Sequence, residues 1–306
     1  MNIKSGTHIN RYIIEKPLSD HGGTAKVFLA HLDKDEKLKV ALKISLTDEN
    51  SKAHEDLLLE REAQLLQGDG WRHPGIVRVF PSPVPGSKPR YHVRTVDLPS
   101  SPYFMVMEYL SGKSLSDQLR TIQSYPLEWK LELFYQILVA VSFIHSKGYG
   151  HRDLKPDNVV FRDPISPNHL PKPVLIDFAL ASKNGQETFD VIEKSLTIDY
   201  SPPEGIAKSE GVKVTCDFMQ WDVWSLGLIF YEILTGRFPI SGNREQVRTT
   251  IIRERLKPVL PDGGDYQLLQ EFISGMLNRE MDKRPTVDLI IKALEGNFLA
   301  PRIPIQ

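Results

Sequence analysis

An eight-residue stretch, residues 151–158, carries the side chains whose types and spacing first suggest chemistry. Asp153 is a possible general base, while Lys155 and Asn158 add a cation and an amide oxygen nearby. Pro156 stiffens the turn between them. Reactive side chains tend to lie on polar loops that rigid elements hold. A solvated charged turn would explain any one of these residues, but the ordered set favours a catalytic loop.

Lys43 is a charged residue in an otherwise apolar, strand-like run. A lysine that points inward requires an anionic partner or must lose its charge. A lysine on a solvated outer face would explain this stretch equally well. Glu62, in an expected helix over residues 53–66, is the predicted partner in preference to Glu55 and Glu60.

Two further features suggest that the chain binds a metal ion and phosphate groups. Asp177 ends an apolar strand-like run, where a buried carboxylate is unfavourable without a cation. It is a candidate Mg²⁺ ligand, with a strand-end cap as the alternative. Gly22 and Gly23 separate two expected strands and permit a tight turn whose backbone amides can face phosphate oxygens. An ordinary hairpin turn explains that glycine pair at least as well.

The elements that must position these residues change character near residues 110–112. Before this turn, short apolar runs predict an antiparallel meander, one helix and two further strands, at residues 12–14, 26–30, 39–44, 53–66, 91–96 and 103–109. The proline-rich flanks within residues 81–101 are expected to be extended loops. After the turn, two strands at residues 159–161 and 174–179 accompany expected helices, at residues 114–124, 131–146, 222–234, 244–255, 266–277 and 287–294. The polar stretch 183–195 has no periodicity and is expected to be mobile.

Composition excludes several classes of function. The 306 residues include 38 Lys and Arg and 39 Asp and Glu, and this net charge of −1 does not favour binding to nucleic acid or an anionic membrane. The lone Cys216 excludes an internal disulfide framework and fits an ordinary thiol in a reducing compartment. Residues 1–10 are polar and do not resemble a signal peptide, and no apolar run in this sequence is long enough to span a membrane, so we expect a cytoplasmic protein. Nothing in the sequence specifies an oligomeric state.

In this order, the motifs resemble those of the protein kinase family, from about residue 12 to residue 294. The resemblance rests on the following segments: Val40-Ala41-Leu42-Lys43 with Glu62, the loop 151–158, Asp177-Phe178-Ala179, Pro202-Pro203-Glu204, Asp222 and Arg284. It implies a two-lobed α+β fold, with an antiparallel β-rich N-lobe over residues 1–110 that contains one helix. A mainly helical C-lobe over residues 111–306 would carry the catalytic loop and the activation segment.

The resemblance also implies a branch of the family and a reaction. Lys155-Pro156 resembles serine/threonine kinases, while residues 22–25 and 61–64 resemble the bacterial, eukaryotic-like (Hanks-type) branch. The implied activity is Mg²⁺-dependent transfer of the γ-phosphoryl group of ATP to serine or threonine hydroxyls of protein substrates, with Mn²⁺ as a possible substitute for Mg²⁺.

Each motif residue has an implied role in that reaction. Asp153 would accept and orient the substrate hydroxyl, and Lys155 would neutralise charge on the γ-phosphoryl group. Lys43, held by Glu62, would bind the α- and β-phosphates. Asn158 and Asp177 would hold Mg²⁺. The remaining nucleotide contacts are assigned to Gly22, Gly23, Val27, Ala41, Met107, Glu108 and Leu110. The resemblance also pairs Arg284 with Glu204 and makes Asp222 a support for the catalytic loop.

Four positions depart from the family pattern. Asp20 and Ala25 replace glycines of the phosphate-binding turn, and repulsion from Asp20 in an exposed loop would cost only about 1 kcal/mol. Ala179 replaces a glycine and should restrict the backbone angle φ. Leu196 precedes Thr197 where many relatives have glycine, which bears on the shape of the substrate loop.

Two other functions compete with an active protein kinase. A pseudokinase would bind nucleotide as a scaffold or regulator, and a small-molecule kinase would share the fold. The joint presence of Lys43, Asp153, Asn158 and Asp177 favours an active enzyme. The long segment that ends at Glu204 favours a protein substrate.

Regulation by phosphorylation is a further possibility that the sequence suggests. Thr188, Ser195 and Thr197 are candidate sites that could pair with Arg152, although Thr197 is expected to have a structural role. Constitutive activity is the alternative.

Overall fold

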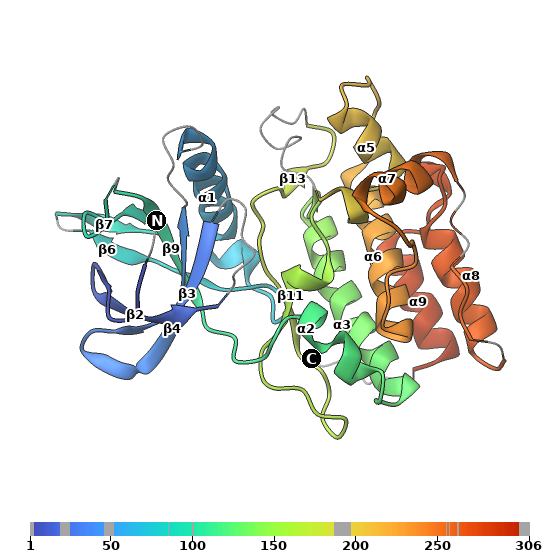
Figure 1. The fold of residues 1–306 in the computed structure, drawn as a ribbon, viewed down its shortest axis with the longest axis horizontal. Coiled ribbons are helices and arrows are strands. Elements are labelled where there is room, and N and C mark those ends of the chain that lie inside the picture. Colours follow the sequence, from blue (N-terminus) through green and yellow to red (C-terminus); the bar gives the residue numbers. More distant parts are fainter. Residues whose placement is uncertain are drawn as a thin grey trace. The chain divides into compact units, whose positions relative to one another are not determined.

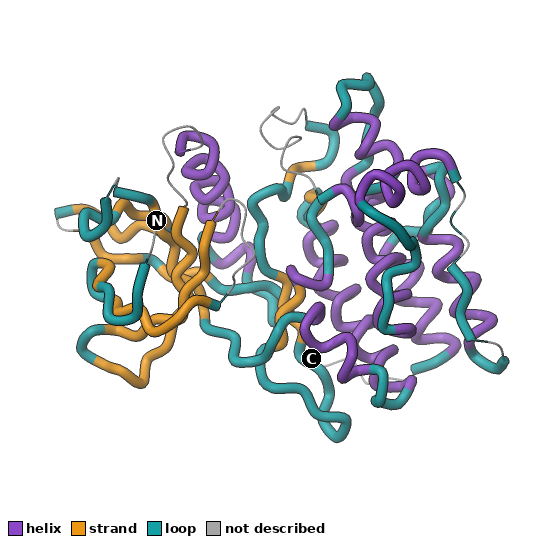
Figure 2. The backbone as a smooth tube through the Cα atoms, viewed as in Figure 1, coloured by secondary structure: helices purple, strands orange, loops and turns teal. Residues whose placement is uncertain are grey.

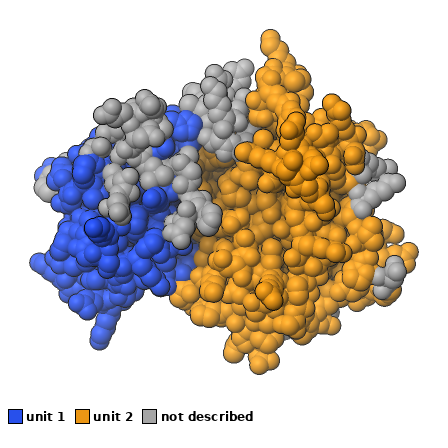
Figure 3. All heavy atoms as spheres, in the orientation of Figure 1, with its two compact units in different colours: residues 1–110 blue, residues 111–306 orange. Residues whose placement is uncertain are grey.

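The structure is a computed structural model that describes residues 3–18, 25–45, 52–84, 86–99, 101–186, 197–254, 256, 258–261 and 263–299. It divides into two compact units, Met1–Leu110 and Ser111–Gln306 (Figure 3). Unit 1 is built mainly from strands and unit 2 mainly from helices (Figure 2). The predicted α+β class is therefore confirmed, and each unit is described by itself.

The main sheet of unit 1 is antiparallel and contains the predicted meander (Figure 1). Its strands pair in the order β1-β2-β3-β4-β9-β5, and β8 also pairs with β9. The strands are β1 (His8–Ile9), β2 (Tyr12–Pro17), β3 (Ala25–Leu32), β4 (Asp35–Ser45), β5 (Val79–Phe80), β8 (His92–Arg94) and β9 (Tyr103–Glu108). Helix α1 (Lys52–Leu66) contacts β4, β8 and β9.

Strand alternation gives this sheet two faces with different tasks. One face forms the core of unit 1, where Leu42, Ile44 and Phe104 are at most 1% exposed. Successive side chains of a strand point to opposite faces, so Lys43 lies on the other face. Cross-strand partners share a face, and Val27 and Met105 lie opposite Lys43 in the neighbouring strands.

The stretch between β5 and β9 contains more structure than the sequence predicted. Besides β8, it forms a separate hairpin of β6 (Ser82–Val84) and β7 (Ser87–Arg90). The prolines in this stretch suggested extended loops, but proline is compatible with short, irregular edge strands. The stretch then returns to the core, because Leu98 is 9% exposed and joins the same apolar cluster as Leu42.

Unit 2 is built around two long apolar helices, α3 (Leu127–Ser146) and α6 (Phe218–Thr235). Phe134 of α3 and Phe230 of α6 stack with ring centroids 3.9 Å apart. The other α-helices in the described part of unit 2 are α2 (Leu115–Ile122), α5 (Pro203–Ser209), α7 (Arg244–Arg253), α8 (Tyr266–Met276) and α9 (Val287–Asn297). Among the described residues, no helix is long and apolar enough to cross a membrane.

Short strands hold the loops of unit 2. β10 (Tyr149–Gly150) pairs with β13 (Ser182–Lys183), and β11 (Val159–Phe161) pairs with β12 (Pro173–Leu175). A Cβ atom on Gly150 would lie 2.5 Å from the backbone oxygen of Phe218, so only glycine fits at this approach to α6.

Several sequence-based expectations for unit 2 were wrong. Helix α6 begins at Phe218 rather than at residue 222. Helix α3 begins at Leu127 rather than at residue 131, directly after Pro126, whose φ of −56° suits a helix start. The strand predicted over residues 174–179 ends at Leu175. Helix α5 was not predicted at all. The predicted mobile stretch 183–195 falls largely outside the described residues.

A substitution at Leu98 tests whether the stretch between β5 and β9 belongs to the core. We expect Leu98→Ala to lower the free energy of unfolding by about 2–3 kcal/mol, because it removes buried methyl groups and leaves a cavity. Val96→Ala is a matched control in the same stretch, since Val96 is 86% exposed, and it should change the stability by less than about 0.5 kcal/mol. Chemical denaturation monitors both. Equal effects of the two substitutions would contradict this packing.

Candidate active site

The loop at residues 151–158 is held by a buried carboxylate from α6. Asp222 is 0% exposed, and its two oxygens accept the backbone N–H groups of His151 at 2.7 Å and Arg152 at 2.8 Å. His145 Nε2 lies 3.0 Å from the same carboxylate. Arg152 has a φ of 66°, which is unfavourable for a residue with a side chain. Asp222 therefore fixes the loop at the point where its backbone is strained, as expected from the sequence.

Asp153 has one bonded and one unbonded carboxylate oxygen. Its Oδ2 accepts hydrogen bonds from Lys155 Nζ and Asn158 Nδ2, both at 2.8 Å. Its Oδ1 is buried and makes no hydrogen bond to any residue that the structure describes. Burial raises the pKa of the Asp153 carboxyl, Lys155 opposes this shift and Asp177 adds to it. An unsatisfied buried acceptor is unfavourable by itself, so Oδ1 is suited to receive a hydrogen-bond donor.

Lys155 connects the loop to the segment that precedes α5. Its Nζ lies 2.8 Å from Asp153 Oδ2 and 2.9 Å from Thr197 Oγ1. The structural contact expected for Thr197 is therefore present. The other two hydroxyls considered for phosphorylation, Thr188 and Ser195, lie outside the described residues.

Asn158 and Asp177 lie at the same end of the β11–β12 hairpin. The backbone N–H of Ile176 donates to the carbonyl of Asn158 at 3.0 Å. Asp177 follows with a φ of 62°, so the chain leaves the strand before this residue rather than after it. This correction explains why alternation within a strand could not predict the direction of the Asp177 side chain. Next to it, the buried ring of Phe178 packs on His151, with centroids 4.7 Å apart.

Unit 1 contributes a buried ion pair. Lys43 Nζ lies 2.6 Å from Glu62 Oε2, and the two side chains are 9% and 0% exposed. The structure thus brings together the two residues that the sequence paired. Val27 and Ala41 share the sheet face of Lys43, as does Met107, which lies opposite Ala41.

The end of unit 1 is fixed by two contacts between Glu108 and Arg78. Glu108 and Arg78 exchange two bonds: the Glu108 N–H donates to the Arg78 carbonyl at 2.9 Å, and Glu108 Oε1 accepts the Arg78 N–H at 3.0 Å. Leu110 is the last residue of the unit. Gly22 and Gly23 lie outside the described residues, as does Asp20, which departs from the family pattern.

A second buried ion pair anchors α5. Arg284 Nη1 and Nη2 donate to the two oxygens of Glu204 at 2.6 and 2.9 Å. Arg284 is 3% exposed, and its guanidinium also lies 5.2 Å from the ring centre of Trp224 on α6. Such a two-point contact fixes the position of both side chains. The pairing expected from the sequence is therefore present.

One buried polar pair was not predicted from the sequence. The hydroxyl of Tyr200 donates to Glu232 Oε2 at 2.8 Å, and Glu232 is 5% exposed. Burial raises the pKa of Glu232 to about 7, Tyr200 opposes this shift, and the charge of Asp157 adds to it. The only signal in the sequence was an isolated glutamate within the apolar run of α6.

Arg152 lies over an aromatic surface. Its guanidinium carbon is 4.3 Å from the ring centre of Phe218 and 5.2 Å from that of Trp221, and Nη1 donates to Ser182 Oγ at 3.1 Å. The residue is only 2% exposed. These contacts join the loop to α6 and β13.

Comparison with known proteins assigns the family. The profile of the protein kinase domain matches residues 20–295. The chain belongs to the protein kinase family, and its two-lobed fold agrees with that assignment. This confirms the expected fold class.

The curated relatives are protein kinases at modest identity. The chain is 33% identical over 198 residues to serine/threonine-protein kinase RAD53 of Saccharomyces cerevisiae. The aligned part is 60% of this chain and 23% of that protein. It is 28% identical over 211 residues to putative ribosomal protein S6 kinase alpha-2 of Caenorhabditis elegans. The aligned part is 64% of this chain and 24% of that protein. It is 30% identical over 282 residues to calcium/calmodulin-dependent protein kinase type 1 of Macrobrachium nipponense. The aligned part is 90% of this chain and 72% of that protein. The chain therefore spans about a quarter of the first two relatives.

The raised pKa of Glu232 predicts a dependence of stability on pH. The folded state binds this proton more tightly than the unfolded chain, so the stabilisation is complete below about pH 4.5 and is lost as the pH rises through about 7. Glu232→Gln keeps an acceptor for Tyr200 but removes the titration. Between about pH 4.5 and pH 8, the unfolding free energy of the wild type should fall relative to that of the variant by up to about 3 kcal/mol.

Chemical denaturation of both proteins across this pH range measures the difference. Glu245→Gln, at an exposed position of α7, is the matched control and should follow the wild type. A constant difference between wild type and Glu232→Gln at all pH values would contradict the prediction.

Proposed function

We propose that this chain is a serine/threonine protein kinase that transfers the γ-phosphoryl group of ATP to a protein hydroxyl with the help of Mg²⁺. The observation that carries the proposal is the state of Asp153, whose Oδ2 is held by two donors while its buried Oδ1 has no partner among the described residues. Oδ1 would accept the hydrogen bond of the incoming hydroxyl and orient its oxygen. Phosphoryl transfer depends mainly on such positioning and on charge stabilisation.

The two lysines, Lys155 and Lys43, have complementary tasks in this proposal. Lys155, already within 2.8 Å of Asp153, would stabilise the charge of the γ-phosphoryl group. Lys43 would bind the α- and β-phosphates, and Glu62 would hold its ammonium group in place. A lysine that is buried beside a fixed carboxylate loses little conformational freedom when phosphate binds, which supports this role.

Asn158 and Asp177 are the proposed metal ligands. Their side-chain oxygens suit a hard cation such as Mg²⁺, or Mn²⁺, which is commonly held by one or two protein ligands together with phosphate oxygens. Two hydrogen bonds from Asn158 Nδ2, to the backbone carbonyl and to Oδ2 of Asp153, orient its amide. When bound, the metal would neutralise charge on the β- and γ-phosphates. Orientation of the hydroxyl would be the task of Asp153.

The adenine and hinge contacts are also proposals. Val27, Ala41 and Met107 share the face of Lys43 and would cover the base. Glu108 to Leu110 would provide backbone groups at its edge. Gly22 and Gly23 would supply amide groups to the phosphates.

Serine/threonine specificity is supported by the contact between Lys155 and Thr197, because the same lysine then contacts both the proposed base and the segment before α5. The name of the Saccharomyces relative points in the same direction. The assignment to the bacterial, eukaryotic-like branch rests on residues 22–25 and 61–64 alone.

The pseudokinase alternative draws its support from Asp20 and Ala179. Ala179 is 7% exposed and is not among the described residues with positive φ. An alanine is therefore accommodated there without the strain that its replacement of glycine suggested. This favours an active enzyme over a nucleotide-binding scaffold.

Asp153→Asn is the most direct test of the proposal. Purified protein is incubated with radiolabelled ATP and Mg²⁺, with and without a generic protein substrate. We expect the variant to lose transfer by about 10²–10⁴-fold, since it lacks the proposed acceptor, while nucleotide binding persists. Asp163→Asn, at an exposed aspartate after β11, serves as the control. Nucleotide binding without any transfer by the wild type would favour the pseudokinase, and full activity of Asp153→Asn would refute the role of Asp153.

A second prediction concerns the ion pair of unit 1. Glu62→Gln removes the charge that orients Lys43, so we expect the KM for ATP to rise and kcat/KM to fall by at least about tenfold. Glu60→Gln on the same helix is the matched control, because the Glu60 side chain is 42% exposed. Steady-state kinetics at varied ATP concentration separates the two. Unchanged kinetics in Glu62→Gln would contradict the assignment of Lys43 to the phosphates.

A further inference from the structure

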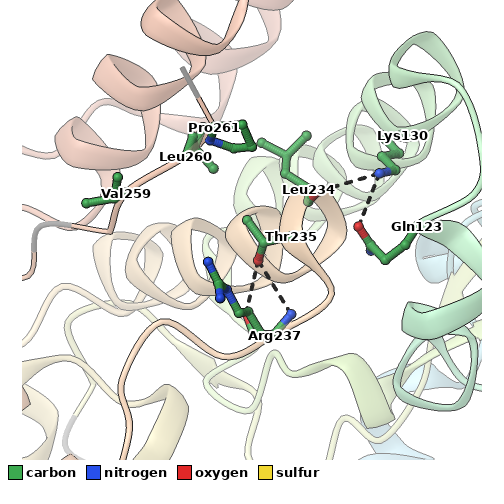
Figure 4. A pocket seen from close by; sticks show the side chains of 8 residues that line it. All are labelled: Gln123, Lys130, Leu234, Thr235, Arg237, Val259, Leu260 and Pro261. Carbon is green, nitrogen blue, oxygen red and sulfur yellow. Dashed lines mark hydrogen bonds between the residues drawn. The ribbon is translucent and has the colours of Figure 1, made fainter. Parts of the chain in front are cut away.

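An open cavity of about 480 Å³ lies in unit 2 between the start of α3, the end of α6 and the loop before α8 (Figure 4). Its volume falls within the range of about 300–1,000 Å³ that is usual for small-molecule sites. Its described lining residues include none of the residues proposed for phosphoryl transfer. The lining combines two cations, Lys130 and Arg237, with apolar surface from Leu234, Leu260 and Pro261.

Lys130 is a buried cation with neutral partners. It is 5% exposed, and its Nζ donates to Gln123 Oε1 at 3.2 Å and to the Leu234 carbonyl at 3.5 Å. Within the described parts of the chain it forms no ion pair. A lysine is rarely this buried unless a carboxylate or another anion accompanies it. Burial accordingly lowers the pKa of this ammonium group.

Lys130 and Gln123 also have a structural task at the end of α6. Gln123 Nε2 donates to the carbonyl of Ile233 at 3.2 Å, and Lys130 reaches the next carbonyl, that of Leu234. These are among the last carbonyls of the helix, which lack partners within it. Capping explains why the two side chains point to this place. It supplies only partial negative charge to Lys130, so a full counter-charge at this position would still be favourable.

Arg237 supplies a second positive charge at the same cavity. Among the described residues, the hydrogen bonds of Arg237 involve only its backbone, whose carbonyl and N–H group contact Thr235 Oγ1 at 3.2 and 3.4 Å. Its exposed guanidinium forms no ion pair with any described residue. No carboxylate occurs among the described residues that line the cavity. Figure 4 shows Lys130 and Arg237 around the cavity, with Leu260 and Pro261 also lining it.

We propose that this cavity binds a small organic carboxylate with an apolar body. Its acid group would lie between Lys130 and Arg237, and its body would pack against Leu260 and Pro261. The guanidinium geometry suits a carboxylate, which it can bind through two hydrogen bonds. The apolar wall favours a ligand that also buries hydrocarbon over a simple inorganic anion. The site is separate from the proposed phosphoryl transfer and can be tested without ATP.

The test compares three probes by isothermal titration calorimetry on the full chain: octanoate, octanamide and inorganic phosphate. Octanoate and octanamide share a hydrocarbon chain and differ in charge, whereas phosphate has charge but no apolar body. We expect octanoate to bind at least about tenfold more tightly than either of the other two, because only octanoate satisfies both parts of the site.

Variants locate the binding. Arg237→Gln should weaken octanoate binding about two- to fivefold, as expected for an exposed charge pair, and Lys130→Gln about tenfold or more. Arg244→Gln is the matched control, since Arg244 is an exposed arginine at the start of α7 and does not line the cavity. Thermal melting reports whether each variant is folded. If Lys130→Gln fails to fold, the affinity of Arg237→Gln for octanoate and the comparison of octanoate with octanamide still test the proposal.

Three results would overturn the proposal. Octanamide binding as tightly as octanoate would remove the role of charge, and phosphate binding as tightly would remove the role of the apolar wall. Equal affinities of Arg237→Gln and Arg244→Gln for octanoate would show that octanoate binds elsewhere on the protein.

Discussion

The carboxylate of Asp222 is the contact on which the arrangement of the loop at residues 151–158 depends. A fully buried carboxylate is unfavourable unless donors surround it, and here two consecutive backbone N–H groups and a histidine do so. The same contacts hold Arg152 in a left-handed conformation. Because the backbone is fixed there, Asp153, Lys155 and Asn158, which follow within six residues, reach one another.

Helix α6 provides this carboxylate, and other residues of the same helix contact the segments around the loop. Trp224 lies beside the Arg284 guanidinium that binds Glu204, and Glu232 binds Tyr200. These contacts seat both ends of the stretch from residue 198 to α5 on one rigid helix. A rigid element that carries several contacts keeps proposed catalytic and substrate-binding groups in register, because none of them can shift alone.

Much of the fold could be predicted because the sequence follows simple periodicities. Alternation in β4 placed Lys43 on the face opposite Leu42, and the position of Glu62 on α1 made the partner recognisable. Helices of unit 2 with clear apolar periodicity were found to within a few residues. The elements that were missed are short or contain proline, and they include β6, β7, α5 and the two-residue strands β1, β10 and β13. Periodicity carries little information in such segments.

Part of the site depended on tertiary contacts that local patterns do not encode. The departure of the chain from β12 before Asp177 requires a left-handed backbone at a non-glycine residue, which no local rule anticipates. Tyr200 and Glu232 are 32 positions apart, and only packing against α6 brings them together. The cavity at Lys130 likewise joins three segments that are distant in sequence.

The β6–β7 hairpin pairs with itself and is not hydrogen-bonded into the main sheet of unit 1. Changes in the length or the tip of this hairpin should therefore have little effect on the main sheet, which contains Lys43 on β4. Evolution could vary this part of the surface independently of the sheet face that carries Lys43. It is also a suitable point for attaching a fluorescent label or an affinity tag, since the core contacts made by Leu98 lie after the hairpin rather than within it.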